Sequence, residues 1–131
     1  MKARNFLLVG IGGAAGGGLR HALTLIPGAH YGISILLINV CGAFLLPIVG
    51  EYLLPRFGAS RGLRLSITTG TIASFTTFSA ITGEMVLRIH NGQHLWALGY
   101  VTLTFVLGLL AAAAGMALAR RWRHDLNQDA P

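Results

Sequence analysis

The stretch GTIASFTTFSAITGE, residues 70–84, carries no charged side chain before its last residue and is rich in hydroxyl groups. Nine Ser or Thr residues occupy the seventeen positions from Ser66 to Thr82. Single hydroxyls inside a helix commonly hydrogen-bond to carbonyls of their own helix, but nine are more than that role requires. The stretch therefore predicts an interrupted helix, in which hydroxyls cap the loose ends and freed carbonyls can hold a cation.

The composition of the whole chain places this stretch in a membrane protein. The chain has 131 residues, of which 53% are hydrophobic and only 11% are charged, whereas soluble domains carry about 25% charged residues. Non-helical backbone is tolerated at membrane depth only where protein buries it or where it lines a wet cavity. We predict an all-α integral membrane protein with a single membrane domain, residues 1–131.

Four runs are apolar and long enough to cross a bilayer, which takes about 20 residues in a helix. The third run contains the hydroxyl-rich stretch, so we expect that span to be broken in its middle. Short segments with Pro, Gly, Arg or His separate the runs and indicate turns. The predicted spans are residues 5–26, 32–54, 63–89 and 95–119.

The basic residues are distributed unevenly across these spans. Arg20 and Arg88 fall on one side of the membrane, and the other eight of the ten Lys and Arg fall on the side of both termini. The positive-inside rule then predicts cytoplasmic termini, and we expect a multi-pass protein of the plasma membrane. Because these residues stand at the ends of apolar runs, the net charge of +6 does not indicate nucleic acid binding. The eight are Lys2, Arg4, Arg56, Arg61, Arg64, Arg120, Arg121 and Arg123.

Polar side chains inside the predicted spans are candidates for function, because they are costly in a bilayer. Asn39 can form an interhelical hydrogen bond or donate to a passing anion. Tyr100, Thr104 and Gly108 are four residues apart and share one helix face, which predicts a pore-lining stripe. Tyr100 alone can instead be an aromatic residue at the membrane interface.

Charged residues near the span ends have a simpler interpretation. Arg20 and Glu84 can each extend to water at the interface. The five His residues lie at or outside the span ends without a metal-ligand spacing, and no nucleophile and base are paired in the sequence. We therefore predict that the chain is not an enzyme.

Two segments resemble a known family. SILLINVCGAFLL, residues 34–46, followed by GTIASFTTFSAITGE with TTFS at 76–79, resembles the Fluc (CrcB) family of fluoride channels. The glycine-rich first span that ends in Arg20, the pair Asn39 and Gly42, and the Tyr100 stripe extend the resemblance over most of the chain. The function that it implies is passive export of cytoplasmic fluoride.

The resemblance also implies an architecture and a site. The fold would be an antiparallel dimer of four-helix subunits with two pores and a third helix broken in mid-membrane. A structural Na+ would be held at the break by the backbone carbonyls of Ala73 and Thr76. Arg20 would lie at a vestibule or anchor the fold. The residues expected to line the fluoride pore are Asn39, Thr77, Phe78, Ser79, Glu84, Tyr100 and Thr104.

These residue types suit fluoride. The ion is small and strongly hydrated, so a pore must replace its water with hydrogen-bond donors, which Asn and hydroxyl groups supply. The positive edge of an aromatic ring can face an anion without binding it too tightly, and conduction requires weak binding at several sites. Phe78 is the residue expected to present its ring edge.

The resemblance leaves the partner open. The family carries a second Phe three residues after the first, and this chain has Ile81 there. Together with the uneven basic charge, Ile81 favours pairing with an oppositely oriented paralogue over pairing with a second copy.

Two functions other than a fluoride channel are compared with the sequence. A proton antiporter of the small multidrug-resistance type requires a carboxylate in the first span, which has none. A non-conducting assembly subunit is the third interpretation.

Overall fold

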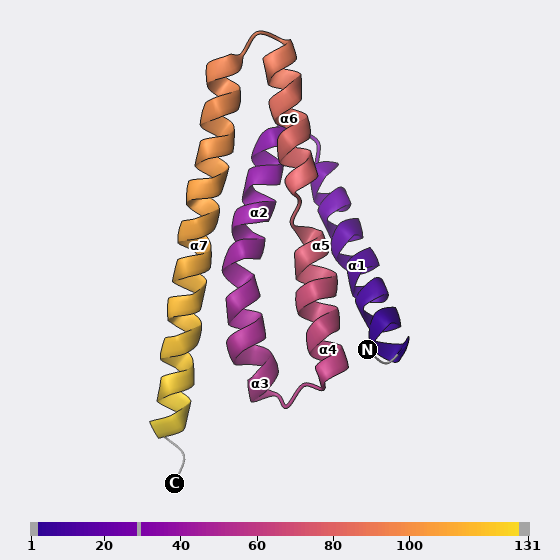
Figure 1. The fold of residues 1–131 in the computed structure, drawn as a ribbon, viewed down its shortest axis with the longest axis vertical. Helices are drawn as coiled ribbons and strands as arrows, with labels where there is room; N and C mark the ends of the chain where they lie inside the picture. Colours follow the sequence, from indigo (N-terminus) through magenta and orange to yellow (C-terminus); the bar gives the residue numbers. More distant parts are fainter. Residues whose placement is uncertain (1–2, 29, 129–131) are drawn as a thin grey trace.

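The structure is a computed structural model that describes residues 3–28 and 30–128, with side chains as far as His124. Within these residues it contains helices and no strand. Both termini lie at the lower end of Figure 1, beside the turn between α3 and α4, and the α6–α7 turn lies at the upper end. The elements are α1 Ala3–Thr24, α2 Tyr31–Ile48, η1 Val49–Leu53, α3 Leu54–Arg56, α4 Arg61–Leu65, η2 Ser66–Ile72, α5 Ala73–Phe75, α6 Phe78–His90 and α7 His94–Gln128.

Three helical stretches among the described residues are long and apolar enough to cross a membrane: Ala3–Thr24, Tyr31–Arg56 and His94–His124. They correspond to the first, second and fourth predicted spans. The third predicted span, residues 63–89, is not one helix but the succession α4, η2, α5 and α6. The chain is therefore an all-helical protein with three apolar helices of membrane-spanning length and a fourth, segmented helical region.

The helix ends differ from the predicted bounds for local reasons. α1 ends at Thr24 because Pro27 and Gly28 follow, and Gly28 adopts a positive φ of 81°. Pro47 lacks an N–H for the carbonyl four residues before it, and the π-helical segment η1 begins two residues later. α7 continues past residue 119 because no Gly or Pro follows as far as Gln128, and the arginines after residue 119 favour helix.

The backbones of α1 and η2 are in direct contact. A Cβ added to Gly12 or to Gly16 would overlap the carbonyl oxygen of Ser66 or of Thr71, respectively. The Ser66 hydroxyl donates to the carbonyl of Leu8 at 2.6 Å across the same contact. Small residues allow this approach between membrane helices. The glycines of α1 thus hold the segmented region against the first span.

α7 packs along α2 and η1 (Figure 1). Gly115 lies against the carbonyl of Phe44, where an added Cβ would overlap it. Near the terminal end, the Tyr52 and Trp122 rings lie 5.2 Å apart, and Arg123 is 2.8 Å from the Glu51 carboxylate. This exposed ion pair contributes about 1 kcal/mol or less, so close helix packing is the stronger link between the two elements.

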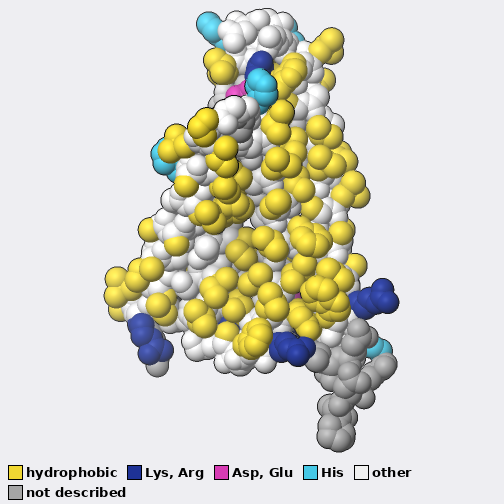
Figure 2. Space-filling model, turned by 180° about the vertical axis from the view of Figure 1, so that it is seen from behind, with side chains coloured by type: hydrophobic (Ala, Val, Ile, Leu, Met, Phe, Trp, Pro, Cys, Tyr) yellow, Lys and Arg dark blue, Asp and Glu magenta, His cyan; other side chains and the backbone are white. Residues whose placement is uncertain are grey.

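The surface is mostly apolar. Figure 2 shows hydrophobic side chains over much of one face, with Lys and Arg mainly at its lower end and again near its upper end. Leu95 and Leu109, for example, are 86% and 70% exposed, which is costly in water but expected where lipid is the solvent. The buried core is small, and its main cluster is Ile35, Ile81 and Tyr100.

Candidate functional site

Helical backbone is interrupted between α5 and α6. Thr76 has φ −77° and ψ 157°, and Thr77 has φ −153° and ψ 123°, so both residues are extended. The Thr77 hydroxyl accepts from the Ala80 N–H at 3.3 Å and caps the start of α6. The Thr76 hydroxyl donates to the Ala73 carbonyl at 3.0 Å at the end of α5. The two threonines therefore satisfy backbone groups on both sides of the interruption.

Asn39 joins α2 to this interruption. Its side-chain carbonyl accepts from the Thr77 N–H at 2.8 Å. Its NH₂ group donates to the Thr77 carbonyl at 3.2 Å and to the Ile35 carbonyl at 2.9 Å. The prediction of an interhelical hydrogen bond is confirmed. Because an amide NH₂ has two donors, both are used by the protein in this conformation.

A cavity of about 490 Å³ opens beside the interruption; we call it the central cavity. It adjoins α2, η2, α5, α6 and α7, so residues far apart in sequence meet there. Gly42 makes room for the Thr76 methyl group, which an added Cβ would overlap. The sequence-predicted site residues that line it are Asn39, Ala73, Thr76, Thr77, Phe78 and Thr104.

Phe78 lines the central cavity and is 63% exposed. Its ring meets that of Phe105 edge to face, with centroids 6.2 Å apart and planes at 67°. Phe105 lines the same cavity and was not identified from the sequence. The only available signal was its position next to Thr104, on a helix with many apolar residues.

Tyr100 and Thr104 face inward. The Tyr100 hydroxyl donates to the Gly32 carbonyl at 2.9 Å, and the residue is only 7% exposed. The alternative of Tyr100 as an interface aromatic is therefore wrong for this chain, because its hydroxyl finds a buried partner on α2. The Thr104 hydroxyl donates to the Tyr100 carbonyl at 2.8 Å. Thr104 and Gly108 line the central cavity, whereas Tyr100 does not.

Ile81, at the position where the resembled family carries a second Phe, is buried. It packs in the core with Ile35 and Tyr100 and also borders the central cavity. An aliphatic side chain here has no ring edge to offer an anion. The aromatic edges at this cavity therefore come from Phe78 and Phe105.

A second opening, of about 400 Å³, lies on the other side of α6; we call it the Glu84 cavity. Arg20, Ser79 and Glu84 line it. The hydroxyls of Ser79 and Thr77 are 3.0 Å apart, and this contact links the lining of the two cavities. Glu84 does not extend to water as predicted: it is only 6% exposed and forms an ion pair with Arg88.

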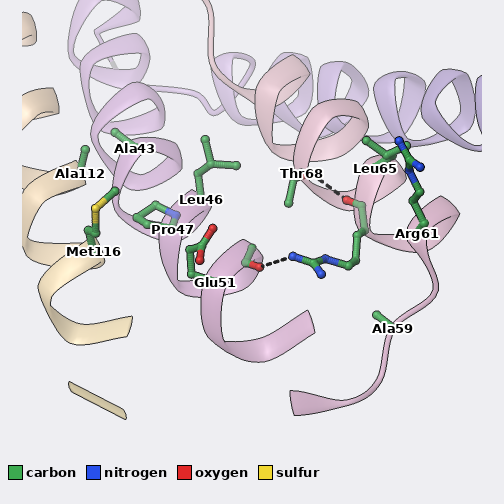
Figure 3. A pocket seen from close by; sticks show the side chains of 12 residues that line it. Ala43, Leu46, Pro47, Glu51, Ala59, Arg61, Leu65, Thr68, Ala112 and Met116 are labelled. Atoms are coloured by element: carbon green, nitrogen blue, oxygen red, sulfur yellow. Dashed lines mark hydrogen bonds between the residues drawn. The ribbon is translucent and has the colours of Figure 1, made fainter. Parts of the chain in front are cut away.

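A third and larger opening, of about 950 Å³, lies at the terminal end; we call it the basic cavity (Figure 3). Arg64 extends across it and donates to the Gly50 carbonyl at 3.3 Å. Arg61 also lines it. The basic and central cavities share Ala43 and Leu46. Residues 55–62, PRFGASRG, are one of the segments with Pro, Gly and Arg that were predicted to be turns, but no cavity was predicted beside it.

These features define a class: a small, all-helical, multi-pass membrane protein with polar groups gathered at an interrupted helical region. The chain belongs to the CrcB-like family, since the family model described as "CrcB-like protein, Camphor Resistance (CrcB)" matches residues 7–116. The resemblance that the sequence suggested is confirmed by this match.

Named relatives agree with the family. A fluoride-specific ion channel FluC from Rhizobium meliloti (strain 1021) is 35% identical, over 88% of this chain and 96% of its own. FluC 2 from Symbiobacterium thermophilum is 39% identical, over 88% and 97%. FluC 2 from Listeria monocytogenes serovar 1/2a is 35% identical, over 88% and 91%. The family match over residues 7–116 includes every residue that lines the two cavities beside the interruption.

Proposed function

We propose that this chain is a subunit of a fluoride-selective ion channel that exports cytoplasmic fluoride passively and confers fluoride resistance. The main support is that relatives named fluoride-specific ion channels align with 88% of the chain. Hydrogen fluoride crosses membranes as a neutral weak acid and dissociates in the more alkaline cytoplasm. The trapped anion then needs a conducting path, and no catalytic step is required.

The proposed path runs along the polar groups beside the interruption. Asn39, Thr77 and Thr104 meet at the central cavity, and Ser79 and Glu84 continue at the Glu84 cavity. Tyr100 supports this track from within the core, through its carbonyl bond to Thr104. The donors of Asn39 already serve protein carbonyls, so a fluoride ion would exchange with these partners. Such exchange gives weak binding, which conduction requires.

Phe78 is the proposed aromatic contact for the ion. Phe78 is 63% exposed in the single chain and lines the central cavity, and its ring meets that of Phe105 edge to face. The positive rim of a phenyl ring attracts an anion weakly. A ring edge at this point would therefore receive dehydrated fluoride without trapping it.

We propose four membrane spans, with residues 63–89 forming the third, interrupted in mid-membrane. The α4–α6 region runs beside the apolar helices over much of their length (Figure 1), which supports this assignment. The central cavity is open along Phe78, so a second subunit would complete its wall. We propose an antiparallel dimer with two pores, surrounded by lipid in the plasma membrane.

The partner in that dimer is either a second copy or an oppositely oriented paralogue. Arg4, Arg56 and Arg64 belong to α1, α3 and α4, and these elements meet at the end of the protein where both termini lie. Arg88 belongs to α6, which leads to the α6–α7 turn at the other end. This bias favours one insertion orientation, with cytoplasmic termini. An antiparallel partner would then be a different chain, and Ile81 would leave that partner to supply a second Phe.

A structural Na+ is the proposed cofactor, and the residues present suit it. α5 ends at Phe75, so the last carbonyls of α5 lack their usual helical partners. The Ala73 carbonyl accepts the Thr76 hydroxyl at 3.0 Å, while the Thr77 N–H, which would be its partner in a continuous helix, donates to Asn39 instead. Hard cations prefer such carbonyl oxygen ligands. Two carbonyls per chain, from Ala73 and Thr76, would give four in a dimer.

Sodium should therefore stabilise the purified protein. We expect a higher unfolding temperature in NaCl than in N-methyl-D-glucamine chloride of equal ionic strength. The gain in unfolding free energy is about 2.7 kcal/mol when Na+ is at a hundred times its Kd. Thermal unfolding in detergent, followed by size-exclusion chromatography, measures it. Equal midpoints in the two salts would remove the sodium proposal.

Fluoride conduction is tested with the purified chain in liposomes. We expect rapid valinomycin-triggered fluoride efflux, read with a fluoride electrode, and no chloride efflux from matched liposomes. Efflux from the lone chain would show that a second copy suffices as partner. A silent lone chain that conducts after co-reconstitution with an oppositely oriented paralogue would support the heterodimer. If neither preparation shows fluoride efflux, the channel proposal is contradicted, and the non-conducting assembly subunit is the interpretation that is left.

A further inference from the structure

Glu84 is a carboxylate buried beside the proposed fluoride path. It is only 6% exposed and lines the Glu84 cavity. Its Oε1 atom lies 2.9 Å from Nε of Arg88, one helical turn later on α6. A negative charge at this point would repel an approaching anion unless a positive charge compensates it.

Arg88 is held in place from two further directions. Its Nη1 donates to the side-chain carbonyl of Gln93 at 2.9 Å, in the turn before α7. Its guanidinium carbon lies 4.1 Å from the centroid of the Trp96 ring. A planar guanidinium can pair with a carboxylate and stack on an aromatic ring at the same time, which an ammonium group cannot do as well.

Further contacts lead from Trp96 into the core and back to Glu84. Trp96 stacks on Tyr100, with centroids 5.0 Å apart and planes at 14°. Tyr100 donates to the carbonyl of Gly32. Gly32 lies beside the carboxylate, since an added Cβ would be 3.2 Å from Glu84 Oε1. The result is a closed ring of contacts that ties α6, α7 and the start of α2 together.

Other charged and titratable groups near the carboxylate do not replace Arg88. Arg20 and Tyr31 line the same cavity from α1 and α2. Among the described residues, however, the ion pair of Glu84 is with Arg88, and Arg20 forms no ion pair within 4.0 Å. The compensation of Glu84 therefore comes from its own helix, through a residue that the α6–α7 turn holds in position.

We propose that Arg88 is a positioning residue for fluoride conduction: it neutralises and orients the Glu84 carboxylate where the anion passes the Glu84 cavity. The inference rests on the proposed channel function. Arg88 touches the carboxylate and not the ion, and it acts by compensating the negative charge of that carboxylate. Gln93 and Trp96 restrict its side chain, so that the pair stays closed while an anion moves past it.

The test uses Arg88→Gln in the liposome efflux assay. Charge focusing in clefts changes on-rates by about 10 to 10³, so we expect at least a roughly tenfold loss of fluoride efflux. The loss should be larger at low ionic strength, where screening is weak. Arg88→Lys retains the charge but not the planar group that stacks on Trp96, so its efflux should lie between that of Arg88→Gln and wild type. Arg121→Gln, at the opposite end of the protein, is the matched control and should match wild type.

The double variant Glu84→Gln with Arg88→Gln separates charge from structure. Removing both charges should give more efflux than Arg88→Gln alone, because no uncompensated negative charge is left at the Glu84 cavity. Full efflux in Arg88→Gln, or no recovery in the double variant, would overturn the proposal. Unfolding temperatures of every variant identify losses due to misfolding. A silent wild-type channel would instead contradict the proposed function itself, so the two failures are distinguishable.

Discussion

Replacing Gly16 with alanine should destabilise this chain more than any other single-methyl change in α1. The added Cβ would overlap the carbonyl oxygen of Thr71, with the backbone of η2 directly behind it. Backbone cannot rotate away as a flexible side chain can, so α1 and η2 must separate. Overpacking of this kind costs about 1–3 kcal/mol and occasionally more, and we expect the upper end of that range.

Separation would also affect the proposed path. η2 leads directly into α5 and the interruption at Thr76 and Thr77. A shift of η2 would move the Ala73 and Thr76 carbonyls and break the Ser66 hydroxyl bond to Leu8. Fluoride efflux from Gly16→Ala should therefore fall with stability. Both are measured on one preparation, by thermal unfolding in detergent and by electrode efflux from liposomes.

Gly17→Ala is the matched control for Gly16→Ala. It adds the same methyl group one position later on the same helix, where no atom outside the immediate helix lies within 4 Å of the new Cβ. Because alanine favours helix by up to about 1 kcal/mol over glycine, this variant should be as stable as wild type or slightly more stable. Equal unfolding temperatures for the two variants would contradict the close contact between α1 and η2.

Hydropathy was sufficient to predict three helices of this fold. The runs that became α1, α2 with its continuation, and α7 are apolar over most of their length, and only their ends were misplaced. These ends depend on local chemistry: the positive φ of Gly28 shortens α1, and the helix-forming basic residues lengthen α7. Such effects extend over a few residues and are averaged out in a hydropathy window.

The hydroxyl-rich stretch predicted an interruption, but by itself it could not indicate which residues would be extended; the position near Ala73 and Thr76 came from the family resemblance. Any of the nine hydroxyls can cap a helix, and the choice of Thr76 and Thr77 depends on Asn39, which lies 38 residues earlier. The contact also requires Gly42, where a larger residue would collide with Thr76. Pairings of this kind depend on tertiary packing and leave no pattern within the stretch itself.

Predictions for charged and aromatic residues near the span ends were less accurate. For Glu84 and for Tyr100, one interpretation placed the side chain at the membrane–water interface, but both residues are buried. The spacing of Glu84 and Arg88, four residues apart on a helix, was a usable signal for an ion pair. Nothing in the sequence indicated that Gly32 would leave room for Glu84 and accept the Tyr100 hydroxyl.

Replacing Asn39 with leucine should abolish most fluoride conduction. Leucine is similar in size but has no polar atoms, so the Thr77 N–H and carbonyl would both lose their side-chain partner. Each part-buried group left unpaired costs about 1–3 kcal/mol, and extended backbone has no helical partner to replace it. We therefore expect the interruption to rearrange and the central cavity to change shape.

The expected loss of efflux is at least about tenfold, since tenfold in rate corresponds to only about 1.4 kcal/mol. Ser34→Ala is the matched control, because Ser34 lies on the same helix and its hydroxyl bonds only to His30 within that helix region. Electrode efflux and unfolding temperature should both fall in Asn39→Leu and stay near wild type in Ser34→Ala. If Asn39→Leu conducts like wild type, then fluoride conduction needs neither the hydrogen bonds between Asn39 and Thr77 nor an amide donor at this position, and the path must lie elsewhere.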